Sequence, residues 1–395
     1  MDPTKNSLAS QRSLVFITAE YPFGKQETFI ENEISILSEA FDRIIVLPKS
    51  TPGSPRTMPP NCIIGTLYGS KNRSIGWRTL CQECFSVMGH WAKFKIAYRS
   101  WQSINKRLTQ ISTSTNGVLG ELVYYSYWLD EGAMAAAFLA QRDGAFAISR
   151  AHGWDVYPVR HPHKYLPYRS YLANSDLVVC PISKHGLEAL REQGFTNLDL
   201  FYLGTPQPKK VEVKNRQGTK TLVSISSCIE LKRVQRIAAI FAALYQRDST
   251  WRWNHFGDGP LAAEVKEWLD KSGAEGYIFH GRQSNETIHQ WLSENANNTI
   301  FINQSTTEGL PVSMMEAMSV GIPCVGTNVG GVSEIIEDGN NGLLHDDGLS
   351  VETVAHLIQA LDEDRLHSMA ENAKNTWQNK FNAEKNHTAF LKRLT

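Results

Sequence analysis

The sequence predicts an α/β protein with two doubly wound parallel sheets, one in each half of the chain. Short apolar runs rich in β-branched residues alternate with amphipathic stretches of helical spacing. The chain has 395 residues, which exceeds what a single hydrophobic core usually holds. A polar stretch without periodicity, rich in Pro and Lys, covers residues 204–218 and is typical of a linker. We therefore expect a first domain at 1–204 and a second domain at 205–376.

The first half contains apolar runs that predict strands at residues 13–19, 43–48, 62–68, 121–128, 146–153 and 176–182. Helices are expected between and after them, at 26–40, 130–142, 163–174 and 183–193. Helix 26–40, for example, places Phe29, Ile30, Ile34 and Leu37 on one face. Strands that alternate with helices in this way pair in parallel.

The same pattern restarts after the linker. Predicted strands cover residues 220–226, 251–257, 277–281, 299–303 and 324–328, and predicted helices cover 233–247, 260–271, 285–295 and 350–361. Parallel α/β sheets bind ligands at the carboxyl ends of their strands. With two such halves facing each other, the cleft between them is the expected site.

Composition excludes several classes of function. Lys plus Arg and Asp plus Glu number 40 each, so no global charge steers the chain to nucleic acid or to a membrane. The first residues lack the apolar core of a secretion signal, and no apolar run approaches the ~18 residues that a membrane helix needs. The six cysteines are scattered, with one C-x-x-C at Cys81 and Cys84, and indicate reduced thiols in a cytoplasmic protein.

The most informative chemistry lies in residues 299–344. A predicted strand is followed by a polar loop, and Gly309-Leu310-Pro311 opens a helical segment. The start of such a helix presents unpaired N–H groups and the positive end of a dipole, which suits a phosphate. Glu308 lies on the loop and Glu316 about two turns into the helix. Ionised carboxylates only accept hydrogen bonds, so this pair beside an anion site indicates a ligand with hydroxyls, such as a nucleotide sugar.

Taken singly, each of these carboxylates has a simpler interpretation. Glu308 alone is read as an acid near a helix start, where the dipole favours it. Glu316 alone is read as part of a solvated helix face. The Gly and Pro residues around the pair favour a ligand role for both.

This stretch resembles the donor-binding signature of glycosyltransferase family 4, whose members are retaining enzymes of GT-B fold. The family pattern has two Glu separated by seven residues within S-x-x-E-G-x-P, followed by G-x-P and by G-G-x-x-E-x-I-x-x-G-x-x-G. The matching positions are Ser305, Glu308, Gly309, Pro311, Glu316, Gly321, Pro323, Gly330, Gly331, Glu334, Ile336, Gly339 and Gly342. The resemblance implies two Rossmann-like domains facing across a cleft. It also implies a donor on the second domain and a last helix, about 377–395, packing back on the first.

The resemblance further implies cations at the donor diphosphate. The family pattern G-R-L-x-x-x-K-G places an Arg and a Lys on the phosphates. Lys232 falls on the Lys, Ser227 replaces the Arg, and Arg233 replaces the last Gly. One expected cation is therefore absent, or Arg233 substitutes for it; the alternative for both basic residues is a solvated helix start, although the dipole disfavours cations there. Gly257 in FGDGP and Arg282 in HGR fall on two further family turns and are assigned to donor binding.

In the first half, the resemblance points to His152, which follows a predicted strand. In similar enzymes a His at this place borders the donor sugar near the reacting carbon; packing or backbone capping is the alternative. Asp155 is expected to orient His152 or to bind acceptor hydroxyls. Gly24 is what remains of the family's Gly-rich loop, and Glu27 either contacts the acceptor or is a first-turn helix acid.

Residues 71–107 form a basic and aromatic stretch that we expect to be helical. Eight basic residues occur with one acid, Glu83, and aromatic residues interleave with them. Such a stretch suits an anionic membrane surface, in line with an enzyme that glycosylates a lipid-linked acceptor. The alternative is an ordinary amphipathic helix over the first sheet. No recognised nucleic-acid module accompanies the charge, so nucleic acid is not an expected partner.

Together these features predict a retaining hexosyltransferase. It moves a sugar from a nucleotide-diphosphate sugar to a glycan, lipid-linked or small-molecule acceptor, in the synthesis of cell-surface polysaccharide or glycoconjugate. Glu308, His152 and Lys232 are the expected catalytic residues, and Glu316 is expected to hold the ribose, with helix-start amides near Leu310 on the diphosphate. We expect a location in the cytoplasm, with contact to the inner face of the membrane as an option.

No residues have metal-ligand spacing, so neither a metal nor a cofactor is expected. Two alternatives remain at this point. One is a nucleotide-sugar epimerase or hydrolase of the same fold, which would turn over the donor without an acceptor. The other is a non-catalytic subunit that binds a sugar nucleotide.

Overall fold

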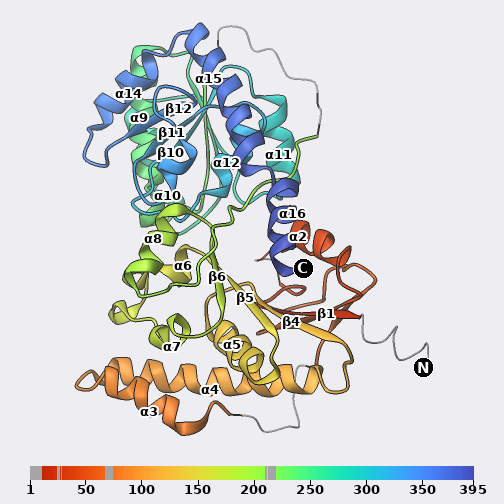
Figure 1. Ribbon diagram of the computed structural model, residues 1–395. Coiled ribbons are helices and arrows are strands. Elements are labelled where there is room, and N and C mark those ends of the chain that lie inside the picture. Colours follow the sequence, from red (N-terminus) through yellow and green to blue (C-terminus); the bar gives the residue numbers. More distant parts are fainter. Residues whose placement is uncertain (1–10, 25–26, 28, 67–73, 210, 212–218) are drawn as a thin grey trace. The chain divides into compact units, whose positions relative to one another are not determined.

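The structure is a computed structural model in which residues 11–24, 27, 29–66, 74–209, 211 and 219–395 are described (Figure 1). The chain divides into two compact units, Met1–Tyr202 with Glu384–Thr395, and Leu203–Ala383. The division falls after Tyr202, where we expected residue 204. Lys71 and Arg73 of the basic stretch, and residues 212–218 of the expected linker, lie outside the described residues.

The first unit is built on a parallel sheet. Its strands are β1 (Arg12–Thr18), β2 (Arg43–Pro48), β3 (Cys62–Ile64), β4 (Glu121–Ser126), β5 (Phe146–Ala151) and β6 (Val178–Pro181). They lie in the order β3-β2-β1-β4-β5-β6, and all neighbours are parallel. The connection direction reverses between β1 and β4, which is where doubly wound sheets bind ligands. The predicted doubly wound sheet is confirmed.

Helices pack on both faces of this sheet. They are α2 (Ile30–Ser38), α3 (Gly76–Ser86), α4 (Trp91–Ser114), α5 (Glu131–Asp143), α6 (Gly153–Val156), α7 (Arg169–Ala173), α8 (Lys184–Glu192) and α16 (Ala383–Leu394). Side chains alternate along β1, so Val15 and Ile17 share a core with α4 and α5, whereas Leu14 and Phe16 share one with α2 and α16. Within the described residues, no helix combines the length and apolar character needed to cross a bilayer.

A buried ion pair ties α16 to the first unit. The Nε of Arg150 lies 3.2 Å from Oε2 of Glu33, and Tyr125 donates a 2.6 Å hydrogen bond to Oε1. His387 of α16 brings Nδ1 to 3.5 Å from Glu33, and the ring of Phe390 lies 4.0 Å from the Arg150 guanidinium. Burial opposes charge on Glu33, but Arg150 outweighs it and holds the pKa below its usual range. Burial lowers the pKa of His387 to about 4, so this ring is neutral at pH 7.

The second unit repeats the architecture. Its strands are β7 (Thr221–Ile225), β8 (Arg252–Phe256), β9 (Tyr277–Phe279), β10 (Thr299–Asn303), β11 (Cys324–Thr327) and β12 (Gly342–His345). They form a parallel sheet in the order β12-β11-β10-β7-β8-β9. The helices are α9 (Val234–Arg247), α10 (Ala262–Ser272), α11 (Asn285–Glu294), α12 (Val312–Ser319), α13 (Val332–Ile335), α14 (Val351–Gln359) and α15 (Glu363–Thr376).

Two elements differ from the sequence-based expectation. The helix expected at 163–174 is only α7 (Arg169–Ala173), preceded by short 3₁₀ turns at Pro158–Arg160 and Pro162–Lys164. Prolines restrict the residues before them and prevent a longer helix. The last helix begins at Ala383 rather than near 377, because Trp377–Phe381 form a π-helical turn that stays in the second unit. There the indole of Trp377 donates to Oγ1 of Thr205 (2.7 Å).

Candidate active site

The loop after β10 folds around the carboxylate of Glu308, which is buried. Three donors meet its Oε1 atom. Lys232 Nζ lies at 2.6 Å, Ser305 Oγ at 2.6 Å and Asn303 Nδ2 at 3.0 Å. The sequence motif explains Ser305, but Asn303 was not singled out, although it ends the strand that precedes the loop. In the described part of the chain all three bonds use Oε1, so Oε2 is available to a ligand.

The electrostatics of this cluster favour an ionised Glu308. Burial raises the pKa of its carboxyl, but Lys232, Ser305 and Asn303 outweigh burial and hold the pKa below its usual range. A charged, half-buried Lys232 at 2.6 Å is therefore paired with a charged Glu308. Removing Lys232 would leave the buried charge of Glu308 without its countercharge.

Gly330 and Gly331 pack directly against the backbone of the Glu308 loop. A Cβ on Gly330 would lie 2.0 Å from the backbone oxygen of Glu308, and one on Gly331 would lie 2.2 Å from that of Gly309. Gly330 also has a φ of +53°, and the amide of Gly331 donates to the Gly309 carbonyl (2.9 Å). The Gly-Gly pair of the motif is thus needed because two backbones meet here.

The helix after the loop begins one residue later than expected. Pro311 is its N-cap, with Leu310 buried beside it, and α12 itself starts at Val312. All of α12 is described, and its first turn carries no acid, so the positive end of the helix is not compensated within the element. Glu316 lies in the middle of α12, about one turn in rather than two, and His289 of α11 brings Nε2 to 3.3 Å from its Oε1.

Arg233 forms hydrogen bonds with the backbone of the Glu308 loop. It has a left-handed backbone conformation (φ 47°) and donates to the backbone oxygens of Gln304 (2.5 Å) and Ser305 (3.2 Å). Its guanidinium also pairs with Asp347. These contacts fix the start of α9 against the Glu308 loop. Arg233 therefore has partners already, whereas we expected it to meet the donor phosphates directly.

Gly257 directly follows β8, and Arg282 lies in the loop after β9. A Cβ on Gly257 would lie 1.8 Å from the backbone oxygen of Ser226, and its amide donates to Gly281 (2.9 Å). Gly257 thus lets the ends of β7 and β8 approach closely. Arg282 is exposed after β9, and no hydrogen bond or ion pair among the described residues joins it to Glu308.

In the first unit, His152 is buried where β5 ends. Its ring packs on Tyr127 (centroids 4.9 Å apart) and Trp128 (4.5 Å). Both ring nitrogens are buried and lack a hydrogen-bond partner within the described residues, although Nδ1 lies 3.9 Å from Oδ2 of Asp155. Asp155 accepts from the backbone amides of His152 (2.5 Å) and Leu129 (2.7 Å), which fixes the turn that carries the imidazole. Its carboxylate is therefore engaged by backbone rather than open to hydroxyls.

Glu27 has a role that neither sequence-based interpretation anticipated. Its buried carboxylate accepts from the amides of Ala19, Glu20 and Tyr21 and from the indole of Trp128. Four donors anchor the loop after β1 and cover the carboxylate. Gly24 belongs to the same loop; it has a φ of +66°, and its amide donates to the carbonyl of Pro52 (2.9 Å).

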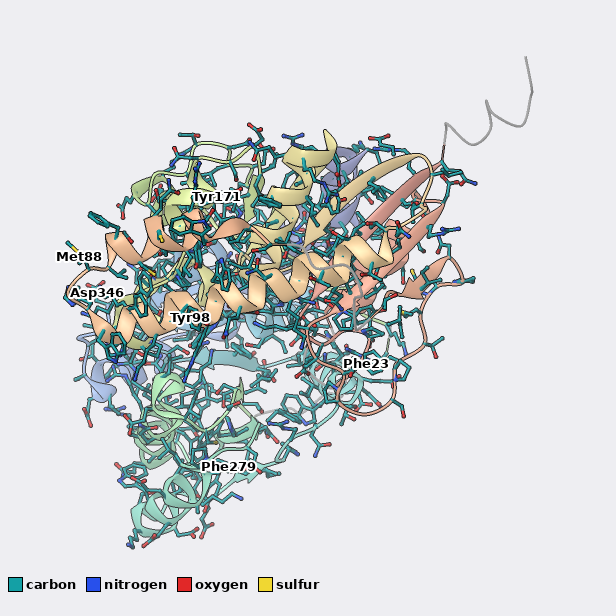
Figure 2. The ribbon with its side chains drawn as sticks, turned by 90° about the horizontal axis from the view of Figure 1, so that it is seen from below. Phe23, Met88, Tyr98, Tyr171, Phe279 and Asp346 are labelled. Atoms are coloured by element: carbon teal, nitrogen blue, oxygen red, sulfur yellow. The ribbon has the colours of Figure 1, made fainter. Side chains whose placement is uncertain are left out.

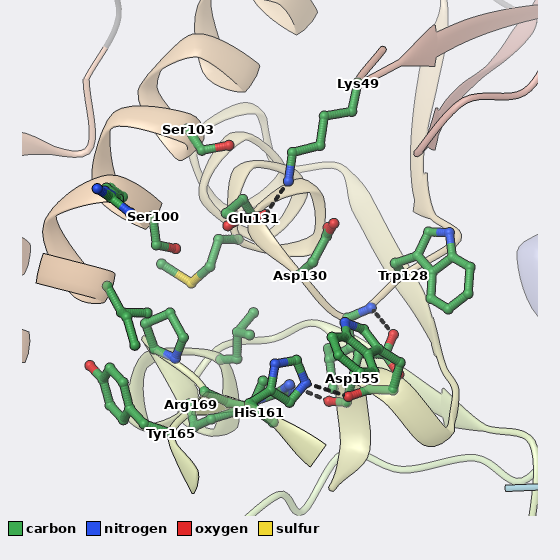
Figure 3. A pocket seen from close by; sticks show the side chains of 18 of the residues that line it. Lys49, Ser100, Ser103, Trp128, Asp130, Glu131, Asp155, His161, Tyr165 and Arg169 are labelled. Carbon is green, nitrogen blue, oxygen red and sulfur yellow. Dashed lines mark hydrogen bonds and ion pairs between the residues drawn. The ribbon is translucent and has the colours of Figure 1, made fainter. Parts of the chain in front are cut away.

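A cavity of about 770 Å³ opens at the carboxyl ends of β1, β2, β4 and β5 (Figure 3). Its lining combines aromatic rings with hydroxyls and charges of both signs. The residues that matter most to its chemistry are Lys49, Ser100, Trp128, Asp130, Tyr165 and Arg169. Tyr165 and Arg169 belong to a basic and aromatic run, 157–172, that the sequence assigns to the acceptor side. We did not single out the other four, although Trp128 ends a predicted strand and Asp130 begins a predicted helix.

Charges in this cavity are only partly compensated. Lys49 pairs with Glu131 (2.9 Å), as the dashed line in Figure 3 shows. Burial and the charge of Glu131 raise the pKa of Asp130 to about 6, although the charge of Lys49 lowers it. Arg169 donates to the backbone oxygen of Asp155, but its Nε and Nη1 atoms are buried without a partner in the described part of the chain. Burial lowers the pKa of Arg169 to about 10.

Comparison with known proteins adds to this geometry. Residues 207–376 match the family model described as glycosyl transferases group 1. The chain is 30% identical over 178 residues to N-acetyl-alpha-D-glucosaminyl L-malate synthase of Bacillus anthracis, covering 45% of each protein. It is 28% identical over 224 residues to the amylovoran biosynthesis glycosyltransferase AmsK of Erwinia amylovora, covering 54% of this chain and 52% of that one. The matches thus span about half the length of these curated relatives.

Solved structures resemble nearly the whole chain. Anabaena Alr3699/HepE in complex with UDP-glucose has a TM-score of 0.66 at 14% identity, covering 96% of this chain and 99% of that one. Sucrose-phosphate synthase from Thermosynechococcus elongatus has a TM-score of 0.71 at 14% identity, covering 97% and 98%. These likenesses show a two-domain α/β GT-B fold. The second unit thus resembles the group 1 glycosyl transferases, and the whole chain shares the GT-B fold.

Proposed function

We propose that the protein is a retaining glycosyltransferase of family 4 that transfers a hexose from a nucleotide-diphosphate sugar. The observation that carries the proposal is the buried Glu308–Lys232 pair beside the uncompensated start of α12. An anion site next to an acceptor-only carboxylate suits a ligand with both a diphosphate and hydroxyls. A nucleotide sugar has both.

The donor is assigned to the second unit. The Lys232 ammonium and the first amides of α12 stabilise the diphosphate, and Oε2 of Glu308 accepts a hydroxyl of the sugar. Glu316 holds the ribose hydroxyls, exchanging its contact with His289 for them. Arg233 acts indirectly, by fixing the loop that carries Glu308.

The transfer needs no covalent enzyme intermediate. The bond between C1 of the sugar and the diphosphate oxygen breaks, and its electron pair leaves with the diphosphate. The acceptor oxygen bonds to C1 on the same face, and its proton passes to a diphosphate oxygen. Charge develops on the leaving group, so the fixed positive groups there stabilise the transition state more than the ground state. We expect no metal or other cofactor to be needed, so a chelator should leave the rate unchanged.

The first unit is assigned to the acceptor, with His152 close to the reacting carbon. Its two unpartnered ring nitrogens can each form a hydrogen bond with a sugar. The cavity volume lies in the ~300–1,000 Å³ range of ligand pockets, and its aromatic rings and hydroxyls suit a glycan or a lipid-linked sugar. The names of several relatives refer to polysaccharide synthesis, and we propose this role in the cytoplasm, at the inner face of the membrane.

Thermal-shift measurements with UDP-, GDP-, ADP- and TDP-sugars test the donor assignment. A ligand that binds only the folded state raises its stability by mass action, so one of these nucleotides should raise the melting temperature. The bound donor is then incubated with acceptor pools and the products are followed by mass spectrometry. Absence of binding by any nucleotide sugar would reject the proposal. Donor turnover without an acceptor would identify an epimerase or hydrolase instead.

A further inference from the structure

Helices α3 and α4 form a hairpin whose tip is apolar and exposed. The tip consists of Phe85, Met88 and Trp91, whose exposed fractions are 73%, 72% and 69%; Trp77, also 69% exposed, lies at the other end of α3. No residue of α3 is fully buried, and although Leu80 and Cys84 are partly covered, Phe85 at its end is exposed. Figure 2 shows Met88 at the turn between the two helices, with Tyr98 farther along α4. Large apolar side chains that gather on a surface in this way mark a site of interaction.

The hairpin is held firmly at its other end. The second half of α4 is part of the core, through Ile104, Leu108 and Ile111. Arg107 donates to the backbone oxygens of Thr18 (2.6 Å), the last residue of β1, and Leu47 (3.2 Å), near the end of β2. The tip is therefore carried by a rigid helix rather than by a loose loop.

The charges around the tip are positive. Lys93 and Lys95 follow the tip in the first turns of α4, and Arg99 on α4 and Arg78 on α3 lie farther along the hairpin. Lys95 places Nζ 5.5 Å from the ring of Trp91. The one acid within 76–99 is Glu83, and it accepts a hydrogen bond from Tyr165. Within 76–99 the cations thus outnumber the single acid, which favours an anionic partner.

The composition of the hairpin favours a lipid surface over a protein as its partner. Protein interfaces are depleted in Lys, whereas two of the four cations here are lysines. Exposed Trp beside Lys and Arg is typical of the boundary between lipid headgroups and acyl chains. We propose that the tip of the α3–α4 hairpin inserts into the headgroup region of a bilayer that contains anionic lipids. This inference extends the membrane part of the proposed function, but it can be tested without any transfer activity.

The test is co-sedimentation of the full chain with vesicles of phosphatidylcholine alone or mixed with phosphatidylglycerol. We expect binding only to the mixed vesicles, and a loss of binding as salt rises. The double variant Phe85→Ser/Trp91→Ser should bind the mixed vesicles at least about tenfold more weakly, since each ring no longer buries apolar surface. Trp268→Ser removes an exposed indole (45%) from α10 in the second unit and should bind like the wild type. Lys93→Glu/Lys95→Glu should also weaken binding, and Lys374→Glu on α15 should not.

Equal binding to both kinds of vesicle, or full binding by the tip variants, would overturn the proposal. So would self-association of the wild type in sedimentation velocity without lipid that Phe85→Ser/Trp91→Ser abolishes, since a second copy would then cover the tip. The thermal shift with nucleotide sugars serves as an independent readout. The tip variants should keep it, because the tip residues belong to the first unit and the donor is assigned to the second.

Discussion

The two units differ in whether the polar side chains of their sites already have hydrogen-bond partners. In the second unit, Glu308 already has three donors, and two glycines hold its loop in place. In the first unit, the ring nitrogens of His152 and two nitrogens of Arg169 are buried without a hydrogen bond in the described part of the chain, with Asp155 Oδ2 3.9 Å from Nδ1 of His152. A sugar nucleotide would therefore meet a carboxylate that is already held in place, with Oε2 still available to it. An acceptor instead supplies hydrogen bonds that the described residues do not make.

This difference predicts how each site responds to mutation. A preformed ion pair is a unit, so losing one member disables the other. Groups without partners act separately, so each substitution has a smaller effect. Four experiments follow, from the largest expected effect to the smallest.

The ion pair should matter most. Glu308→Gln and Lys232→Ala should each slow transfer by about a hundredfold or more, because each removes a charge that acts at the reacting centre. The double variant should be little worse than either single variant, because the two residues act together. Initial rates at saturating donor measure this effect. Lys271→Ala, which breaks an exposed ion pair with Glu267 on α10, is the control and should be neutral.

Rates near wild type for Glu308→Gln or Lys232→Ala would reject the assigned roles. Additive losses in the double variant would show that the pair is not a functional unit.

The glycine that packs on the Glu308 loop gives the next effect. Gly330→Ala would place a Cβ 2.0 Å from the Glu308 backbone oxygen, at a φ of +53°. Gly339→Ala meets nothing within 4 Å but has a similar φ of +74°, so it isolates the backbone strain. We expect about 1 kcal/mol of destabilisation for Gly339→Ala and at least about 2 kcal/mol for Gly330→Ala.

Urea denaturation measures both losses, and the thermal shift with the donor should disappear only for Gly330→Ala. Equal destabilisation by the two variants would mean that the close approach to Glu308 is unimportant.

The Glu308 site of the second unit was easier to predict from the sequence than the cavity of the first unit, for a physical reason. Glu308, Ser305 and the Gly-Gly pair lie within thirty residues, so local turn chemistry and spacing reveal them. The first cavity joins the ends of several strands with α4 and the 161–169 segment, so its members are far apart in sequence. Glu27 illustrates the limit. Its position suggested an acceptor contact or a first-turn helix acid, whereas tertiary contacts bury its carboxylate under four hydrogen-bond donors.

His152 tests the unpartnered groups of the first unit. His152→Phe keeps the ring volume and the packing on Tyr127 and Trp128 but removes both nitrogens. A neutral hydrogen bond contributes about 1 kcal/mol, so we expect transfer to slow about five- to tenfold with donor binding unchanged. Initial rates and thermal shifts measure the two quantities. His367→Phe, an exposed residue on α15, is the control. An unchanged rate in His152→Phe would show that this ring only packs.

Asp130 gives the smallest effect and depends on pH. Its carboxyl has a pKa of about 6 in the folded protein against 3.8 normally, because burial and Glu131 disfavour its charge. The folded state therefore binds the extra proton, and stability falls as pH rises from about 4 to about 6. Asp130→Asn keeps an oxygen to accept from the Gly132 amide at the start of α5, but it cannot ionise. We expect the variant to be about 1–2 kcal/mol more stable than the wild type above pH 6, with no gain near pH 4. Urea denaturation at a series of pH values measures the difference. The exposed Asp176→Asn should parallel the wild type, and a parallel curve for Asp130→Asn would contradict the raised pKa.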